Sequence, residues 1–142
     1  MQRTRTDTRP RGIIAVAIVG LTLTTAYIHL SLGGLLFTLN AIGYAALAVA
    51  MIVIATVPHW LVRRFDWVPR VGLAVYTLVT IGGYLVMGPY FGLGWLAKAI
   101  EVGILALLLG DVLRAFGSPR GLIRAALASV GLGRGTRPVG LA

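Results

Sequence analysis

Residues 34–57 read GLLFTLNAIGYAALAVAMIVIATV, and this stretch decides the fold class because it contains no charged side chain. A helix rises 1.5 Å per residue, so these residues would form a helix of about 36 Å, longer than a hydrocarbon layer of about 30 Å. Pro58 ends this stretch, and no proline lies inside it or inside the other apolar runs. The sequence therefore predicts an all-α, four-transmembrane-helix bundle within residues 12–117. Its spans are residues 12–30, 34–57, 71–87 and 95–113.

The composition is that of a membrane protein. The 142 residues are 58% hydrophobic and 12% charged, with a mean hydropathy of +0.90, whereas about a quarter of the residues in a soluble domain are charged. The chain has no cysteine, which excludes disulfides, thiol nucleophiles and cysteine-ligated metals. It contains no H-E-x-x-H, Walker A or G-x-S-x-G motif. Its two histidines, His29 and His59, would lie about a bilayer apart, so one chain cannot supply both axial ligands of a haem. We expect no enzyme, no cofactor and no metal.

Basic residues set the predicted orientation. All twelve arginines precede the first span, lie between the second and third, or follow the fourth, and the other two connections carry no charge. Under the positive-inside rule, both termini lie in the cytoplasm of a multi-pass cell-membrane protein, with residues 1–11 as a basic tail. Residues 12–30 also resemble a signal peptide, but the run is long and no clean A-x-A cleavage site follows it. Because each basic segment adjoins a span, we expect contact with anionic lipid headgroups and not with nucleic acid.

A short helix is predicted after the last span. Ser118 is a favourable N-cap, Pro119 suits the first helical position, and Gly131 can end the helix in a left-handed conformation. Apolar residues recur between them at helical spacing, which is typical of an amphipathic helix at a membrane interface. We therefore expect an interfacial helix over residues 118–131 and a disordered basic tail over residues 132–142.

Small residues repeat along the second and fourth spans. Lipid gives helices no hydrophobic reason to associate, so close packing at small residues and polar contacts drive their association. These stripes would join neighbouring helices of one chain or two protomers, which predicts a homo-oligomer or a larger membrane complex. The stripes are Ala41, Ala45, Ala48 and Ala55 in the second span, and Ala99, Gly103, Ala106 and Gly110 in the fourth.

Two residues of opposite charge, Lys98 and Glu101, fall inside the fourth span. They are three residues apart, so they share one helical face and can pair. An ionisable group in hydrocarbon costs about 2.5 to 3.5 kcal/mol on insertion scales, and such groups usually face the interior or a wet cavity. Two interpretations stay open: a functional pair, or a Lys98 side chain that reaches the outer interface with Glu101 as its counter-ion. Asp111 precedes Arg114 by three residues, which favours a local ion pair at the inner interface.

Hydrogen-bonding residues from the other three spans lie at the same outer level. His29 ends the first span, and Tyr84 lies in the outer third of the third. Asn40 lies about 9 Å below the outer start of the second span, with Tyr44 one turn deeper. Such a cluster forms a ligand pocket, an ion or proton site, or a structural network that locks the helices together. The candidate ligand or ion pocket is His29, Asn40, Tyr44, Tyr84, Lys98 and Glu101.

Residues 27–44, YIHLSLGGLLFTLNAIGY, resemble a pattern in a family of small four-helix membrane proteins from high-GC bacteria and haloarchaea. In that family, a His-Leu near the end of the first helix precedes Leu-Phe-x-Leu-Asn-Ala-x-Gly-Tyr in the second. The later Lys98-Ala99-Ile100-Glu101 is similar to a Lys and Glu pairing in the same group. The resemblance covers about the first three quarters of the chain. It implies the four-helix fold and the choice of site residues, and it implies no activity.

Two functions follow from these patterns. The first is a small membrane protein whose outer-leaflet pocket binds a small ligand or ion, with transport in a dimer as one use of that binding. In it, Glu101 bears the charge, Lys98 regulates it, and Asn40 donates a hydrogen bond. The second is a non-catalytic accessory subunit that docks onto a larger membrane complex through its small-residue stripes and outer charges.

Overall fold

The computed structural model describes residues 9–132, which contain six helices and no strand. The all-α prediction is therefore confirmed for this part of the chain. The predicted tails, residues 1–11 and 132–142, lie almost entirely outside the described residues. The helices are α1 (Arg9–Leu32), α2 (Leu35–Thr56), α3 (Trp60–Arg64), α4 (Trp67–Met87), α5 (Gly92–Phe116) and α6 (Pro119–Ser129).

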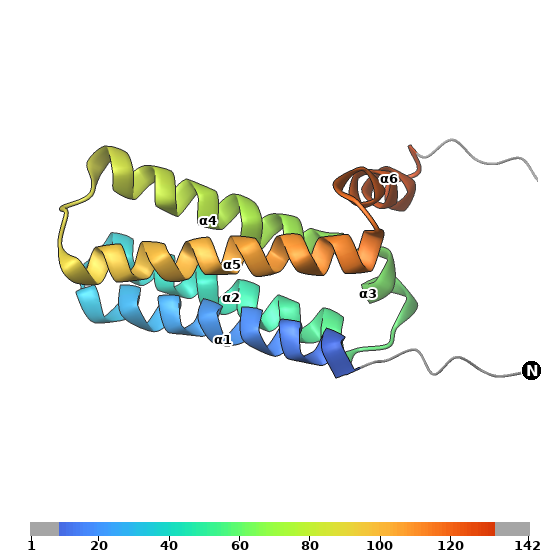
Figure 1. Ribbon diagram of the computed structural model, residues 1–142, viewed down its shortest axis with the longest axis horizontal. Coiled ribbons are helices and arrows are strands. Elements are labelled where there is room, and N and C mark those ends of the chain that lie inside the picture. The colour runs from blue at the N-terminus through green and yellow to red at the C-terminus, as the bar shows by residue number, and fades with distance from the viewer. Residues whose placement is uncertain (1–8, 133–142) are drawn as a thin grey trace, which may run out of the picture.

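Four long helices, α1, α2, α4 and α5, run side by side along the length of the molecule (Figure 1). Helix α1 packs against α2 and α5, and α4 packs against α5 and more sparsely against α2. Helices α3 and α6 lie together at one end, which we call the arginine end (Figure 1). The opposite end, formed by the connections 33–34 and 88–91, we call the cavity end. Two consecutive glycines, Gly33 and Gly34, join α1 to α2 with φ angles of +70° and +82°, a conformation that side chains other than hydrogen rarely tolerate.

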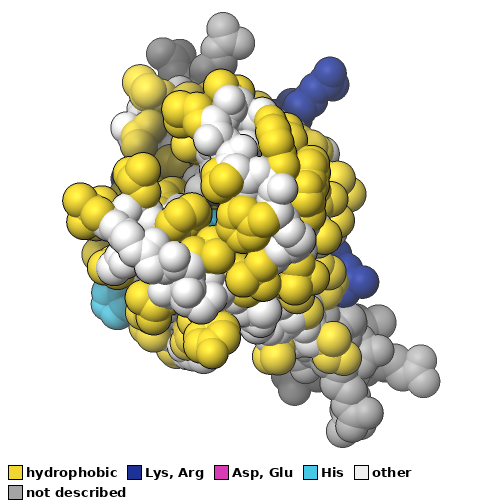
Figure 2. Space-filling model, turned by 90° about the vertical axis from the view of Figure 1, so that its left-hand side faces the viewer, with side chains coloured by type: hydrophobic (Ala, Val, Ile, Leu, Met, Phe, Trp, Pro, Cys, Tyr) yellow, Lys and Arg dark blue, Asp and Glu magenta, His cyan; other side chains and the backbone are white. Residues whose placement is uncertain are grey.

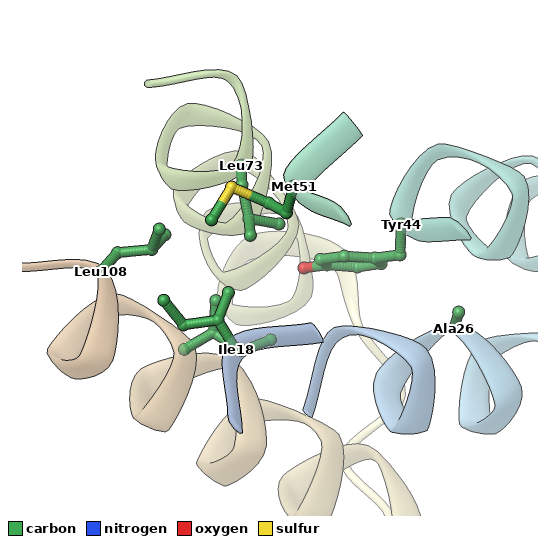
Figure 3. Close-up of a cluster of buried hydrophobic side chains, with 7 residues drawn as sticks. Ile18, Ala26, Tyr44, Met51, Leu73 and Leu108 are labelled. Atoms are coloured by element: carbon green, nitrogen blue, oxygen red, sulfur yellow. The ribbon is translucent and has the colours of Figure 1, made fainter. Parts of the chain in front are cut away.

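The core takes side chains from all four long helices. Ile18 of α1, Met51 of α2, Leu73 of α4 and Leu108 of α5 point toward one another in Figure 3, and each is at most 3% exposed. Tyr44 continues this cluster toward the cavity end and is fully buried. The aliphatic core is therefore continuous with a polar side chain, that of Tyr44.

The helix bounds differ from the predicted spans in the connections. Helix α4 begins at Trp67, four residues before the predicted start, so Pro69 lies in its first turn. Proline is tolerated there because a first-turn N–H has no partner within the helix. The short helix α3 was not predicted. Near the C-terminus, Ser118 is the N-cap of α6 and its Oγ accepts from Gly121 N at 3.0 Å, as expected.

Three helices are long and apolar enough to cross a membrane: Gly12–Leu32, Leu35–Thr56 and Trp67–Met87. Many large apolar side chains on their outer faces are exposed, among them Leu36 at 81% and Val86 at 81%. Contiguous exposed apolar surface on this scale is atypical of a soluble monomer and compatible with a membrane protein. A fourth span in α5 and the side on which the termini lie remain predictions.

Candidate functional site

The Glu101 carboxylate is fully buried, and one of its oxygens is held by two side chains. Lys98 Nζ donates to Glu101 Oε2 at 2.5 Å, and Thr80 Oγ1 donates to the same oxygen at 3.2 Å. Lys98 Nζ also donates to the Thr80 carbonyl at 3.3 Å and lies 5.4 Å from the centre of the Tyr84 ring. Lys98 is only 7% exposed. Its side chain therefore turns into the protein, which favours the interpretation of Lys98 and Glu101 as an internal pair.

The other carboxylate oxygen faces α1. Thr25 Oγ1 donates to Glu101 Oε1 at 3.4 Å, and His29 Nε2 lies 3.7 Å from that oxygen. On the far side of Thr80, the Tyr44 hydroxyl shares a 2.6 Å hydrogen bond with Thr80 Oγ1. The network thus joins all four long helices. A buried ion pair needs such additional hydrogen bonds because its mutual attraction alone does not offset the loss of hydration.

The His29 ring leaves one nitrogen free to take a proton. Its Nδ1 lies 2.8 Å from the Thr25 carbonyl, and a carbonyl oxygen can only accept, so Nδ1 carries a hydrogen. In the neutral ring, Nε2 then has a lone pair directed at the Glu101 region, where Oε1 is also an acceptor. Two acceptors 3.7 Å apart cannot bond to each other. A proton on Nε2 would place a cation next to Glu101 Oε1, and the two groups would form a charge-assisted hydrogen bond if they moved closer than the present 3.7 Å.

A cavity of about 570 Å³ adjoins the network between α2 and α4. This volume lies within the range of sites for drug-sized ligands, about 300 to 1,000 Å³. His29, Lys98, Thr80 and Asn40 line it among mainly apolar side chains, and Glu101 does not line it. The cavity-facing titratable groups therefore include two bases and no carboxylate. Figure 2 looks onto this end of the molecule, where hydrophobic and uncharged groups dominate and basic side chains appear toward the edges.

Glycines admit the aromatic rings that shape the cavity. The Tyr84 ring lies against Gly94, where an added Cβ would come within 2.5 Å of the Tyr84 hydroxyl. Gly83 lines the cavity and has open space where its Cβ would be, whereas its neighbour Gly82 has equal space but lies outside the lining. A larger side chain at Gly83 would therefore occupy the cavity, and one at Gly82 would not.

Of the predicted pocket residues, Lys98 and His29 lie directly against the Glu101 carboxylate, and Tyr44 joins it through Thr80. The Tyr84 ring lies against Lys98, and its hydroxyl donates to the Phe91 carbonyl at 3.4 Å. Asn40 lines the cavity, but its hydrogen bond is through its backbone carbonyl, which accepts from the Tyr76 hydroxyl at 3.3 Å. Within residues 9–132 the Asn40 amide group makes no hydrogen bond, so it remains available to a ligand. The network residues that the sequence analysis did not select are Thr25 and Thr80. Their signal was the spacing of four residues that separates each from a selected residue, His29 or Tyr84.

A second charged cluster lies at the arginine end. Arg70 Nε donates to Asp111 Oδ2 at 2.6 Å, so Asp111 of α5 is tied to α4. The local ion pair between Asp111 and Arg114, expected from their spacing, stays a prediction. Arg70 Nη1 also lies 3.4 Å from Asp66 Oδ2. Burial raises the pKa of the Asp66 carboxyl above its ordinary value, Arg70 opposes this rise, and Asp111 adds to it.

The same end anchors α6. Arg64 donates to the Ser129 carbonyl through Nε at 2.9 Å and Nη2 at 2.6 Å. Trp67 Nε1 donates to the Ser129 hydroxyl at 3.0 Å. The short helix is therefore held against the junction of α3 and α4. Its position on a membrane surface remains a prediction.

Within residues 9–132, no group of three or more His, Asp or Glu side chains is placed to hold a metal ion. Comparison of the chain with protein-family models, curated proteins and solved structures finds no match. The resemblance to small four-helix membrane proteins therefore remains a prediction, and the function must be argued from the site itself.

Proposed function

We propose that this chain is a multi-pass membrane protein whose cavity binds a small amphiphilic ligand. One observation carries the proposal: an apolar cavity whose polar lining groups come together beside a buried ion pair. Ligand sites combine predominantly apolar walls with a few polar groups that fix orientation, and this cavity has that composition.

In this proposal α5 forms a fourth span. Its 25 residues would reach about 37 Å. Lys98 and Glu101 argue against a span only if they face lipid, and both are buried against other helices and hydrogen-bonded. Intramembrane charges that are retained in this way are usually functional.

The distribution of arginine supports cytoplasmic termini. Arg63, Arg64, Arg70, Arg120 and Arg124 all belong to the arginine end, whereas the connections at the cavity end have no charged residue. The positive-inside rule then places the cavity in the outer leaflet. The exposed arginines of α3 and α6 would contact anionic lipid headgroups at the cytoplasmic face.

The ligand would enter from the bilayer. The cavity lining includes Leu36, Leu39, Val79 and Met87, whose side chains are 81%, 54%, 65% and 82% exposed on the outer surfaces of α2 and α4. An opening between these helices would face lipid chains and not water. Such an entrance favours a molecule with an apolar body and one polar group.

The adjacent glycines on α4 provide the test. Gly83→Leu should fill the cavity, and Gly82→Leu is a matched control because it adds the same side chain outside the lining. The full chain would be extracted from its own membrane in mild detergent and analysed by native mass spectrometry. We expect a retained small molecule in the wild type and in Gly82→Leu, and its loss in Gly83→Leu. Equal retention in all three proteins, or none in the wild type, would contradict the proposal.

The accessory-subunit function remains a second candidate, supported by one observation. Ala41 and Ala48 of the α2 stripe are buried within the chain, but Ala99 and Ala106 of the α5 stripe are exposed. That face of α5 would allow close approach of a helix from another protein or a second copy. Recovery inside a larger assembly in the same extraction would favour this function.

A further inference from the structure

We propose that the cavity binds a monoanionic amphiphile together with one proton, which His29 Nε2 takes up. This inference rests on the proposed function, because it names the ligand class of the same cavity. The ligand has an alkyl or similar apolar body and a single anionic oxygen head. The starting observation is that the two titratable nitrogens in the lining, on His29 and Lys98, face the cavity while the carboxylate lies behind them.

The first step concerns donors that are left free. A lysine ammonium has three N–H donors, and Lys98 uses two of them, on Glu101 Oε2 and the Thr80 carbonyl. Asn40 adds an amide with two further donors and no partner within the described residues. Oxygen atoms of an anionic head would accept from these donors without breaking the Lys98 to Glu101 contact.

The second step concerns charge. With a neutral imidazole, Lys98 and Glu101 cancel, so the site has no net charge before the ligand arrives. An anion alone would leave one uncompensated negative charge in a water-poor site, which is strongly unfavourable. One proton restores neutrality, and it comes from a buffer acid in the surrounding water, whose O–H or N–H bond breaks and whose conjugate base stays in solution. The only covalent bond formed is N–H at His29 Nε2, and the summed charge of the site is zero before and after binding.

The third step concerns where the proton goes. Nδ1 of His29 already carries a hydrogen, so Nε2 is the basic position, and protonation gives it a donor toward Glu101 Oε1, 3.7 Å away. The Glu101 carboxylate then has a cation on each oxygen. The carboxylate can then stay charged even when Lys98 also donates a hydrogen bond to the ligand.

The remaining titratable groups around His29 are tyrosines. Tyr44 of α2 lies 5.7 Å from His29 between ring centres, Tyr76 of α4 packs edge-on against Tyr44 at 5.0 Å, and Tyr84 of α4 lies against Lys98. On the same helix as His29, Tyr27 is 71% exposed. Phenols are neutral near neutral pH, so the charge balance is set by His29, Lys98 and Glu101.

The test is calorimetric titration of the full chain in detergent micelles near neutral pH. The probes are 1-octanesulfonate, which stays a monoanion, and 1-octanol as its neutral match, each blanked against protein-free micelles. Repeating the titration in phosphate and in Tris buffer measures the protons taken up on binding. We expect close to one proton with 1-octanesulfonate and none with 1-octanol.

Variants assign the roles. His29→Gln should abolish proton uptake and weaken the binding of 1-octanesulfonate by about tenfold. The control is His59→Gln, at the exposed histidine of the arginine end, which should change neither quantity. Lys98→Met combined with Glu101→Gln removes both charges together, which avoids leaving one of them unpaired in the interior. This double variant should bind 1-octanesulfonate at least about tenfold more weakly and 1-octanol unchanged.

The outcomes separate the two proposals. If 1-octanol binds and Gly83→Leu removes it, but 1-octanesulfonate binds no better and without a proton, the anion and proton inference is overturned and the cavity proposal stands. If proton uptake persists in His29→Gln, His29 is not the acceptor and the inference is again overturned. If neither probe binds the wild type, both proposals fail.

Discussion

The two ends of the molecule hold a carboxylate against a base in different ways. At the cavity end, Glu101 is fully buried against Lys98, and a cavity adjoins the pair. At the arginine end, the side chains of Asp111 and Arg70 are mostly buried, at 14% and 13% exposure, and that of Asp66 is 32% exposed. Arg70 there also donates to the Asp66 carbonyl at 2.6 Å and lies over the Phe116 ring. Its donors join helices, whereas Lys98, His29 and Asn40 keep donor or acceptor positions unused beside a cavity.

The largest expected contrast is in the carboxylates themselves. Glu101→Leu leaves the Lys98 ammonium buried without its partner, so we expect a loss of about 3 to 5 kcal/mol in the free energy of unfolding. After Asp111→Asn, Arg70 still donates to the Asp66 carbonyl, and its side chain is more exposed than that of Lys98. We therefore expect a smaller loss in the free energy of unfolding, about 1 to 3 kcal/mol. Unfolding in mixed micelles, followed by tryptophan fluorescence, would measure both. Adding Lys98→Met to Glu101→Leu should recover much of the lost stability. Equal losses for Glu101→Leu and Asp111→Asn would contradict the difference between the two ends.

A smaller contrast comes from helix spacing. An added Cβ at Gly43 would lie 2.1 Å from the Tyr76 hydroxyl, so the Tyr76 ring must shift or α2 and α4 must move apart. We expect Gly43→Ala to destabilise the protein by about 1 to 3 kcal/mol. Gly110→Ala, on α5 nearer the arginine end, meets nothing within 4 Å and should be neutral or stabilise by up to about 1 kcal/mol. The same unfolding measurement applies. A Gly43→Ala protein as stable as the wild type would show that Tyr76 and α4 shift at little cost in free energy.

At the arginine end, stability should depend on pH through Asp66. Its pKa is raised from an ordinary 3.8, chiefly by burial, so the folded protein binds this proton more tightly than the unfolded chain. The corresponding stabilisation is fully present below pH 3.8 and is lost as the pH rises through the folded pKa. Asp66→Asn cannot titrate, so it should gain stability relative to the wild type across that window. Parallel stability curves for the two proteins from acidic to neutral pH would contradict this.

The smallest effect is expected at the contact that holds α6. Ser129→Ala removes the acceptor of Trp67 Nε1 but keeps the backbone carbonyl that Arg64 contacts, so we expect a loss of about 1 kcal/mol. The measurement is amide hydrogen exchange, which should accelerate in α6 and not in α1. Ser31→Ala is the control at the cavity end, because Ser31 bonds only within its own helix, to the Ile28 carbonyl. Unchanged exchange in α6 would show that Arg64 alone is sufficient.

The four long helices and α6 were predictable because their signals are local, whereas α3 was not predicted. Apolar runs, Pro58, Ser118 and Gly131 mark ends or connections through the conformation of a few neighbouring residues. The level of the polar cluster was also predictable, since depth follows from counting 1.5 Å per residue along a helix.

The rotation of each helix about its own axis and the side-chain contacts between helices were not predictable. Asn40 was predicted as a pocket residue, but its level alone could not show that its amide is unbonded while Tyr44, four residues on, is fully buried. The pairing of Asp111 with Arg70 joins residues 41 apart, and a local spacing rule finds only Arg114. The cavity itself depends on how far α4 stands from α2, which hydropathy does not encode.

The glycine pair between α1 and α2 limits how the cavity can change shape. Two residues span about 7 Å at most, which limits how far either helix can slide along the other. His29 and Asn40 therefore keep nearly constant relative heights on one hairpin, while Lys98 belongs to the other hairpin, formed by α4 and α5. A motion that moved these two hairpins apart as units would alter the separation of Asn40 from Lys98 much more than its separation from His29. A pair of distance probes placed across each separation would report whether the cavity opens as two rigid halves.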